Sequence, residues 1–117
     1  MKAPVRVLVV DDDPSLRLLC RVNLEHAGFQ VAEAATVEEA EAALDDRPDV
    51  VLLDVHLGGS ESTGVLRRIH EEHIPVAIVT GSVDVAEYRG IADAVLSKPF
   101  VPAMLVEVAS RLARVGE

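Results

Sequence analysis

Apolar residues in this chain gather in short runs, and four of the runs lead directly into polar residues. Runs of this kind, rich in Val, Leu and Ile, are typical of parallel strands that helices cover on both faces. The runs lie at residues 7–10, 50–53, 76–79 and 95–97, and the polar residues that follow them are Asp11, Asp12 and Asp13, then Asp54, Thr80 and Lys98. Because parallel strands end at a common edge of their sheet, we expect these polar side chains to lie near one another.

Signals for helices lie between the runs. Asp13 and Pro14 predict a helix start after the first run, because Asp caps a helix and proline is harmless at its first position. That helix is expected to end near Ala27, with Gly28 as the left-handed residue beyond it. A short strand at residues 29–32 should follow.

The remaining helices are predicted by capping residues and by apolar residues at helical spacing. Thr36 and Glu39 form a capping box that opens the second helix. The segment from Asp84 to Gly90 is the weakest element and supports a helix of two turns at best. The residues expected on inward faces are Ala40, Ala43 and Leu44 in the second helix, Val65, Leu66 and Ile69 in the third, and Leu105, Ala109 and Leu112 in a last helix at residues 101–115.

Strands and helices alternate along the whole chain, which predicts βαβ units with right-handed crossovers. Five such units form a three-layer α/β sandwich, and 117 residues suffice for one domain with one core. We therefore expect residues 1–117 to be a single domain in which the fourth helix is short or mobile.

The composition narrows the class of partner. Lysine and arginine total 11 against 20 aspartates and glutamates, a net charge of −9, which argues against direct binding to nucleic acid or to an anionic membrane. Cys20 is the single cysteine and falls in a helical apolar pattern, so no disulfide framework is expected. Without a signal-peptide pattern or a span of apolar residues, we expect a cytoplasmic protein.

The polar residues at the strand ends predict phosphoryl chemistry. Asp11, Asp12 and Asp54 would repel one another without a counter-charge, and a hard divalent cation such as Mg²⁺ resolves this. Asp54 can also act as a nucleophile toward phosphorus, giving an acyl phosphate. Thr80 and Lys98 can stabilise the phosphoryl oxygens by hydrogen bonding and charge.

As a set, these motifs resemble response-regulator receiver domains of two-component systems, the CheY-like superfamily. The resemblance covers essentially the whole chain and rests on four segments, which are Val9-Val10-Asp11-Asp12, Leu53-Asp54, Val79-Thr80-Gly81 and Lys98-Pro99-Phe100. It implies a flavodoxin-like parallel sheet of five strands in the order 2-1-3-4-5. It also implies a partner histidine kinase or histidine phosphotransfer protein and a downstream protein partner.

The resemblance further implies roles for individual residues. Asp54 would be the phosphoacceptor. Asp12 would bind Mg²⁺ directly, Asp11 would bind it through water, and the backbone carbonyl of His56 would be a further ligand. Mn²⁺ could substitute for Mg²⁺. Thr80 and Lys98 would contact the phosphoryl group, so the chain would catalyse only its own phosphorylation and slow dephosphorylation.

The sequence departs from the usual receiver pattern in the second half of the chain. Gly58 and Gly59 stand where the family often has proline, and Val95 stands where an aromatic switch residue is common. The spacing from Thr80 to Lys98 is short. Together with the segments at residues 54–59 and 74–81, this short spacing resembles a subgroup of receivers, often single-domain, whose fourth strand ends in an Ala-Thr-Gly-aromatic motif.

Other functions remain open at the level of sequence. A metal-dependent phosphatase of the haloacid dehalogenase type would need an aspartate where His56 stands, and dinucleotide binders need a glycine-rich loop in place of the three aspartates. A pseudo-receiver that binds partners without phosphorylation is the main alternative. Whether the chain is a monomer or a weak homodimer, contact surfaces are expected on the first helix at Leu18 and Val22 and on the last helix at Met104, Val108 and Arg111.

Overall fold

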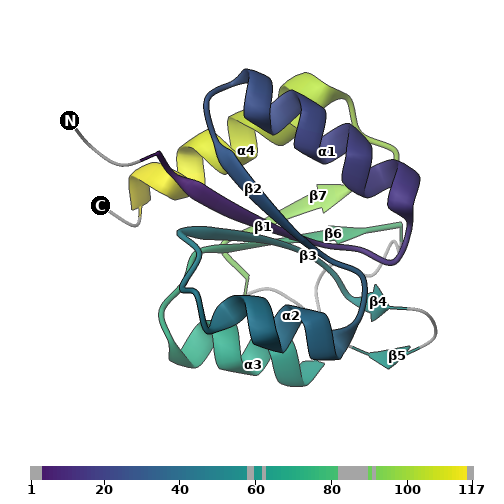
Figure 1. Ribbon diagram of the computed structural model, residues 1–117, viewed down its shortest axis with the longest axis vertical. Helices are drawn as coiled ribbons and strands as arrows, with labels where there is room; N and C mark the ends of the chain where they lie inside the picture. The colour runs from purple at the N-terminus through teal and green to yellow at the C-terminus, as the bar shows by residue number, and fades with distance from the viewer. Residues whose placement is uncertain (1–3, 58–59, 62, 82–89, 91, 116–117) are drawn as a thin grey trace.

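The computed structural model has an α/β fold in which a parallel sheet lies between two layers of helices (Figure 1). The structure describes residues 4–57, 60–61, 63–81, 90 and 92–115. The elements in chain order are β1 (Arg6–Val10), α1 (Pro14–His26), β2 (Gln30–Ala34), α2 (Val37–Leu44), β3 (Val50–Asp54), β4 (His56–Leu57), β5 (Ser60–Glu61), α3 (Thr63–Glu71), β6 (Val76–Thr80), β7 (Ala94–Ser97) and α4 (Pro102–Val115).

The main sheet has the strand order β2-β1-β3-β6-β7, and every pairing in it is parallel. Counted as the five strands of this sheet, the order is 2-1-3-4-5, so the flavodoxin-like prediction is confirmed. The register places Val10 beside Leu53, Asp54 beside Val79 and Thr80 beside Ser97. The carboxyl ends of neighbouring strands therefore lie level with one another.

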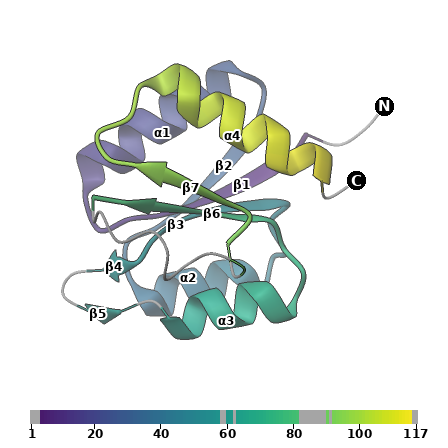
Figure 2. The same ribbon diagram turned by 180° about the vertical axis from the view of Figure 1, so that it is seen from behind.

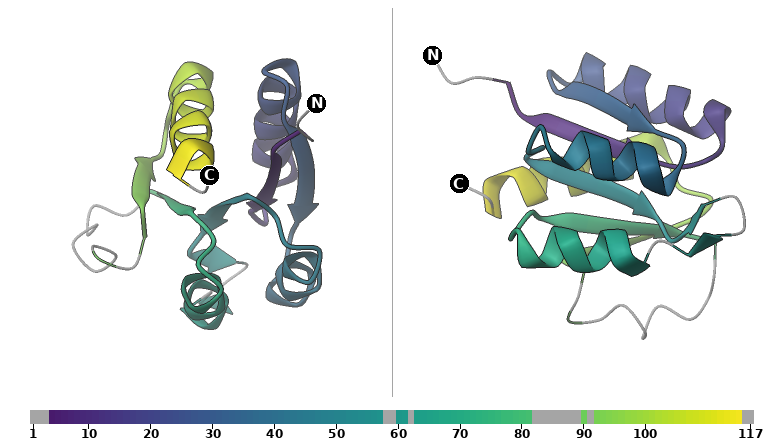
Figure 3. Two further views of the ribbon diagram at one scale, coloured as in Figure 1. Left: turned by 90° about the vertical axis from the view of Figure 1, so that its left-hand side faces the viewer. Right: turned by 60° about the horizontal axis from the view of Figure 1, so that its bottom comes forward.

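Helices cover both faces of the sheet, as the edge-on view in Figure 3 shows. Helices α1 and α4 lie on one face, and α2 and α3 lie on the other (Figures 1 and 2). Alternate residues of β1 serve the two layers: Val7 and Val9 join the core cluster with α1 and α4, while Leu8 and Val10 join the cluster with α2 and α3. Each fully buried aliphatic side chain stabilises the fold by about 1.5–3 kcal/mol.

The predicted inward residues of the helices are confirmed. Cys20 is buried in the layer formed by α1 and α4, and its burial raises the pKa of the thiol to about 11. The prediction that Val108 lies on a contact surface is wrong, because its side chain belongs to the core. The buried or partly buried residues that match the prediction are Ala40, Ala43, Leu44, Val65, Leu66, Ile69, Leu105, Ala109 and Leu112.

Two local predictions need correction. Strand β2 continues to Ala34, two residues beyond the predicted end, because Glu33 and Ala34 stay paired with β1 although Glu33 breaks the apolar run. In the capping box, Thr36 accepts a hydrogen bond from the Glu39 N–H as predicted. The Glu39 carboxylate, however, accepts from the N–H of Ala35, one residue before the cap.

The antiparallel pair of β4 and β5 was not predicted, because two residues per strand are too few to show a period. The predicted short helix between Asp84 and Gly90 and the Gly58-Gly59 segment lie outside the described residues. Within the described part of the chain, no helix is both long and apolar enough to cross a membrane.

Candidate functional site

The predicted polar residues meet at the carboxyl edge of the main sheet. Asp54 and Thr80 are the last residues of β3 and β6, and Asp11 and Lys98 come directly after β1 and β7. These four strands are neighbours in the sheet. The convergence expected from the apolar runs is therefore observed.

Three carboxylates form the centre of this edge. Oxygens of Asp11, Asp12 and Asp54 all lie within 4.8 Å of one another. Asp11 and Asp54 are buried residues, with exposed fractions of 3% and 6%, whereas Asp12 is exposed. The cluster is thus enclosed on the side of the sheet and open at Asp12.

Lys98 supplies the positive charge beside the two buried acids. Its Nζ lies 3.1 Å from Oδ2 of Asp11 and 3.2 Å from Oδ2 of Asp54. Burial by itself would lower the pKa of Lys98, but hydrogen bonds and charges from the two carboxylates outweigh it, so the pKa is raised. Lys98 is therefore firmly protonated and bridges β1 and β3 from the end of β7.

The surroundings of Asp11 raise the pKa of its carboxyl group. Burial raises its pKa, and the nearby Asp54 charge adds to this effect. A hydrogen bond from the Asp13 N–H, at 2.9 Å, and the contact with Lys98 only partly offset the increase. A further cation at the cluster would favour the charged form of this group.

Thr80 lies at the same edge with an exposed fraction of 1%. Its backbone carbonyl accepts a hydrogen bond from the Lys98 N–H at 2.8 Å, which fixes the start of the β7–α4 connection against β6. Thr80 and Lys98 are therefore held together by backbone contact, as well as by strand pairing.

His56 follows two residues after Asp54 and lies in β4. Its side chain is outside the described part of the structure, and the role of its backbone carbonyl as a metal ligand stays a prediction.

Arg17 also contacts the site, although no sequence motif pointed to it. Its Nη1 donates to the backbone carbonyl of Asp11 at 2.7 Å, and its Nε lies 3.2 Å from Oε1 of Glu33. Only its place one turn into the helix that follows the aspartates could have drawn attention to it. That signal is weak, because most such residues face solvent.

A shallow depression of about 380 Å³ opens beside Lys98. Leu16 and Leu19 of α1 line one part of it, and Pro99 and Phe100 line another. Apolar surface therefore adjoins the charged edge on the side of α1 and α4.

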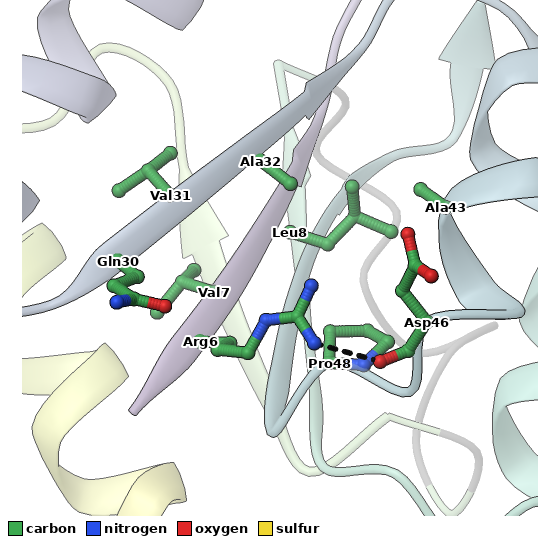
Figure 4. Close-up of a pocket in the computed structure, with 9 residues that line it drawn as sticks. All are labelled: Arg6, Val7, Leu8, Gln30, Val31, Ala32, Ala43, Asp46 and Pro48. Atoms are coloured by element: carbon green, nitrogen blue, oxygen red, sulfur yellow. Dashed lines mark hydrogen bonds between the residues drawn. The ribbon is translucent and has the colours of Figure 1, made fainter. Parts of the chain in front are cut away.

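A second, smaller pocket lies at the opposite end of the sheet (Figure 4). Its rim carries Arg6, the first residue of β1, whose Nη1 donates to the carbonyl of Asp46 at 2.9 Å. This contact ties β1 to the end of α2. The pocket is remote from the carboxylates, which follow the other end of β1.

The donor set of the carboxylate cluster suits a hard divalent cation. Mg²⁺ prefers oxygen ligands in an octahedral shell and keeps several waters, so a few carboxylates with one open side form a suitable partial site. Asp11, Asp12 and Asp54 meet this description. The residues present therefore fit the metal that phosphoryl transfer requires.

Comparisons with known proteins agree with this geometry. The sequence model of the protein family described as the response regulator receiver domain matches residues 7–110 of this chain. The DNA-binding response regulator MtrA of Mycolicibacterium smegmatis is 36% identical over 116 residues, which cover 93% of this chain and 51% of MtrA. The C4-dicarboxylate transport transcriptional regulatory protein DctD of Pseudomonas aeruginosa is 35% identical over 120 residues, which cover 97% of this chain and 26% of DctD.

A solved structure gives the same result. The receiver domain of NtrX from Brucella abortus superposes with a TM-score of 0.83 at 31% identity, over 92% of this chain and 98% of that domain. The chain thus corresponds to about half of MtrA or a quarter of DctD, but to nearly all of an isolated receiver domain.

Proposed function

This chain belongs to the response regulator receiver domain family and is a phosphoacceptor signalling domain, and from that premise we propose that Asp54 accepts the phosphoryl group with Mg²⁺ bound beside it. One observation carries the proposal. Asp54 ends a central strand, is buried, and lies within reach of both the other acids and the Lys98 ammonium. No other aspartate among the described residues combines these features.

The proposed reaction moves a phosphoryl group from a phosphohistidine on a partner protein. An oxygen of Asp54 forms a bond to phosphorus while the bond from phosphorus to the imidazole nitrogen breaks, and the electron pair remains on the imidazole. Water later attacks the acyl phosphate, which restores the carboxylate and releases phosphate. The chain thus catalyses only its own modification and its reversal.

Each neighbouring group has a proposed part in this reaction. Asp12 and Asp54 would hold Mg²⁺ directly, Asp11 through water, and the His56 carbonyl would complete the protein ligands; the bound ion, with Mn²⁺ as a substitute, would neutralise the approaching phosphoryl charge. Lys98 is placed to pair with a phosphoryl oxygen, because its Nζ already lies 3.2 Å from Asp54 Oδ2. The Thr80 hydroxyl is proposed to donate to another such oxygen.

Partners are proposed to dock on the apolar surface near this edge. Leu18 and Val22 on α1 and Met104 on α4 have exposed fractions of 60%, 56% and 50%. These helices lie on the same face of the sheet (Figure 1). A histidine kinase or phosphotransfer protein would cover part of this surface while it reaches Asp54.

The remaining predictions are carried forward as proposals. Residues 1–117 would act as one cytoplasmic receiver domain, a monomer or a weak homodimer, which reports its phosphorylation to a downstream protein partner by a shift in conformation. Direct binding to nucleic acid is not proposed, since the net charge is −9. A phosphorylation-independent pseudo-receiver is not favoured, because the full set of acids, hydroxyl and lysine is present.

The test is phosphorylation by acetyl phosphate, followed by intact mass. In the presence of Mg²⁺, the wild-type chain should gain the mass of one phosphoryl group, and a chelator should abolish the gain. Asp54→Asn should not be modified. Asp13→Asn is the matched control, because Asp13 is adjacent to the acids but serves as the cap of α1, and asparagine caps equally well. An unchanged yield in Asp54→Asn would refute the proposed acceptor.

A further inference from the structure

Arg17 is hydrogen-bonded to the loop that carries Asp11 and Asp12. It has no part in the phosphoryl transfer proposed above. Its Nη1 donates to the Asp11 carbonyl at 2.7 Å, a short charge-assisted hydrogen bond. The side chain is mostly buried, with an exposed fraction of 18%. Arg21, one turn later on α1, is 48% exposed and pairs with Glu25 and Glu33.

The bonded carbonyl belongs to the peptide that joins Asp11 to Asp12. Because a peptide unit is planar, fixing its carbonyl also fixes the direction in which the chain enters Asp12. The peptide before Asp11 is fixed as well, since the Asp11 N–H donates to the Ala34 carbonyl at 3.0 Å. Arg17 therefore completes the orientation of the backbone that carries both acids.

A cation so close to a metal site needs its own counter-charge. An unpaired guanidinium would repel Mg²⁺ and weaken its binding. Glu33 on β2 supplies this counter-charge, because its Oε1 lies 3.2 Å from Arg17 Nε. Glu33 holds a second cation through Oε2, which lies 2.9 Å from Nη1 of Arg21. The arrangement keeps the geometric effect of Arg17 while the neighbouring carboxylate offsets its charge.

We propose that Arg17 is a positioning residue of the metal site, which holds the Asp11–Asp12 peptide in the orientation that binds Mg²⁺ while Glu33 neutralises its charge. The inference rests on the proposed function, because it assumes that this cluster binds Mg²⁺. It extends that function by giving a role to a residue that, in the proposed site, would contact neither Mg²⁺ nor the phosphoryl group.

Titration calorimetry with Mg²⁺ on the full chain tests the inference. Substitution of a group that orients a metal ligand typically lowers the affinity for the metal by about 10–100-fold. We therefore expect Arg17→Ala to raise the Kd for Mg²⁺ by about 10-fold. Arg17→Lys keeps the charge but not the forked geometry, so its Kd for Mg²⁺ should lie between those of the wild type and Arg17→Ala. Arg21→Ala is the matched control: it removes an arginine that pairs with the same Glu33, and its Kd should equal that of the wild type.

The possible outcomes separate this inference from the proposed function. If Arg17→Ala folds, as judged by circular dichroism, and binds Mg²⁺ as tightly as the wild type, Arg17 has only a structural role and the inference is wrong. If Arg17→Ala does not fold, a wild-type Kd in Arg17→Lys overturns the inference in the same way. If the wild type itself binds no Mg²⁺, the proposed metal site fails and this inference fails with it.

Discussion

Lys98 and the two buried acids beside it form the residue-scale unit on which the site depends. The sequence showed these residues because each follows an apolar run, so the rule for parallel strand ends was sufficient to bring them together. It did not reveal that Lys98 contacts both carboxylates, since side-chain distances of 3.1 Å and 3.2 Å depend on the exact register of β1, β3 and β7. Arg17 was missed for a similar reason, because its partner is a backbone carbonyl that carries no sequence signal.

Asp11 gives a prediction for stability against pH in the absence of metal. Its pKa is raised in the folded protein, chiefly by burial, so its contribution favours folding below the unfolded pKa of 3.8 and is lost as pH rises through the folded pKa. At neutral pH the charged Asp11 therefore opposes folding. We expect Asp11→Asn to raise the free energy of unfolding at pH 7 in the presence of a chelator, and this gain should disappear at pH values below 3.8.

Urea unfolding at several pH values measures this effect. Added Mg²⁺ should stabilise the wild type, because a ligand of the folded state shifts the equilibrium toward it, and should stabilise Asp11→Asn less. Asp13→Asn should behave as the wild type in both respects. A destabilised Asp11→Asn at pH 7 without metal would show that the pairing with Lys98 outweighs burial of the charge.

At the scale of elements, the ends of the helices show most clearly what sequence can and cannot predict. Gly28 ends α1 in the left-handed conformation, with φ of +99°, and the N–H groups of Gly28 and Phe29 donate to the carbonyls of Glu25 and Leu24. These bonds form a Schellman motif, in which the left-handed residue Gly28 was predicted from the sequence. The same bonding pattern ends α3, but the left-handed residue there is His73, with φ of +58°, which no sequence rule indicated.

These two helix ends predict opposite effects of substitution on stability. Gly28→Ala should lower the free energy of unfolding by about 1–2 kcal/mol, because a Cβ disfavours the left-handed conformation. His73→Gly should raise the free energy by up to about 1 kcal/mol, since it removes the same strain from α3. The control is Gly64→Ala within α3, where an added Cβ meets no atom within 4 Å apart from its chain neighbours and the backbone of its own helix, so no loss is expected.

Urea denaturation of the three variants gives the comparison directly. The critical result is the sign of the change in the free energy of unfolding, negative for Gly28→Ala and positive for His73→Gly. If Gly28→Ala and Gly64→Ala had equal effects, the left-handed conformation at Gly28 would not be the source of its cost. A loss of stability in His73→Gly would mean that contacts of the histidine side chain exceed the strain at its backbone.

At the scale of the whole molecule, the two faces of the sheet differ in what they expose. The large apolar residues that are exposed in the described part of the chain all lie on α1, on α4 or just before α4; they are Leu18, Leu19, Val22, Val101 and Met104. The helices α2 and α3 on the other face carry none of these. Among the described residues, the surface adjoining the depression near Lys98 therefore carries the exposed apolar side chains that the proposed protein partner would cover.

The overall architecture was the most predictable level. Alternation of strands and helices over 117 residues leaves few arrangements once crossovers are right-handed, and the strand order followed from the resemblance to receivers. Prediction was poorer where few residues define an element, as for β4 and β5, and where polar residues interrupt a strand, as Glu33 does in β2. The function depended on the joint placement of residues at one edge, which the topology fixes.

The central claim is that Asp54 alone accepts the phosphoryl group, and the most direct measurement identifies the modified residue in the wild-type chain. The protein is treated with acetyl phosphate and Mg²⁺ and then with borohydride, which reduces an aspartyl phosphate to homoserine, and its peptides are analysed by mass spectrometry. The structure predicts homoserine at Asp54 and at no other aspartate. Homoserine at Asp11 or Asp12, or its absence from every peptide, would contradict the account.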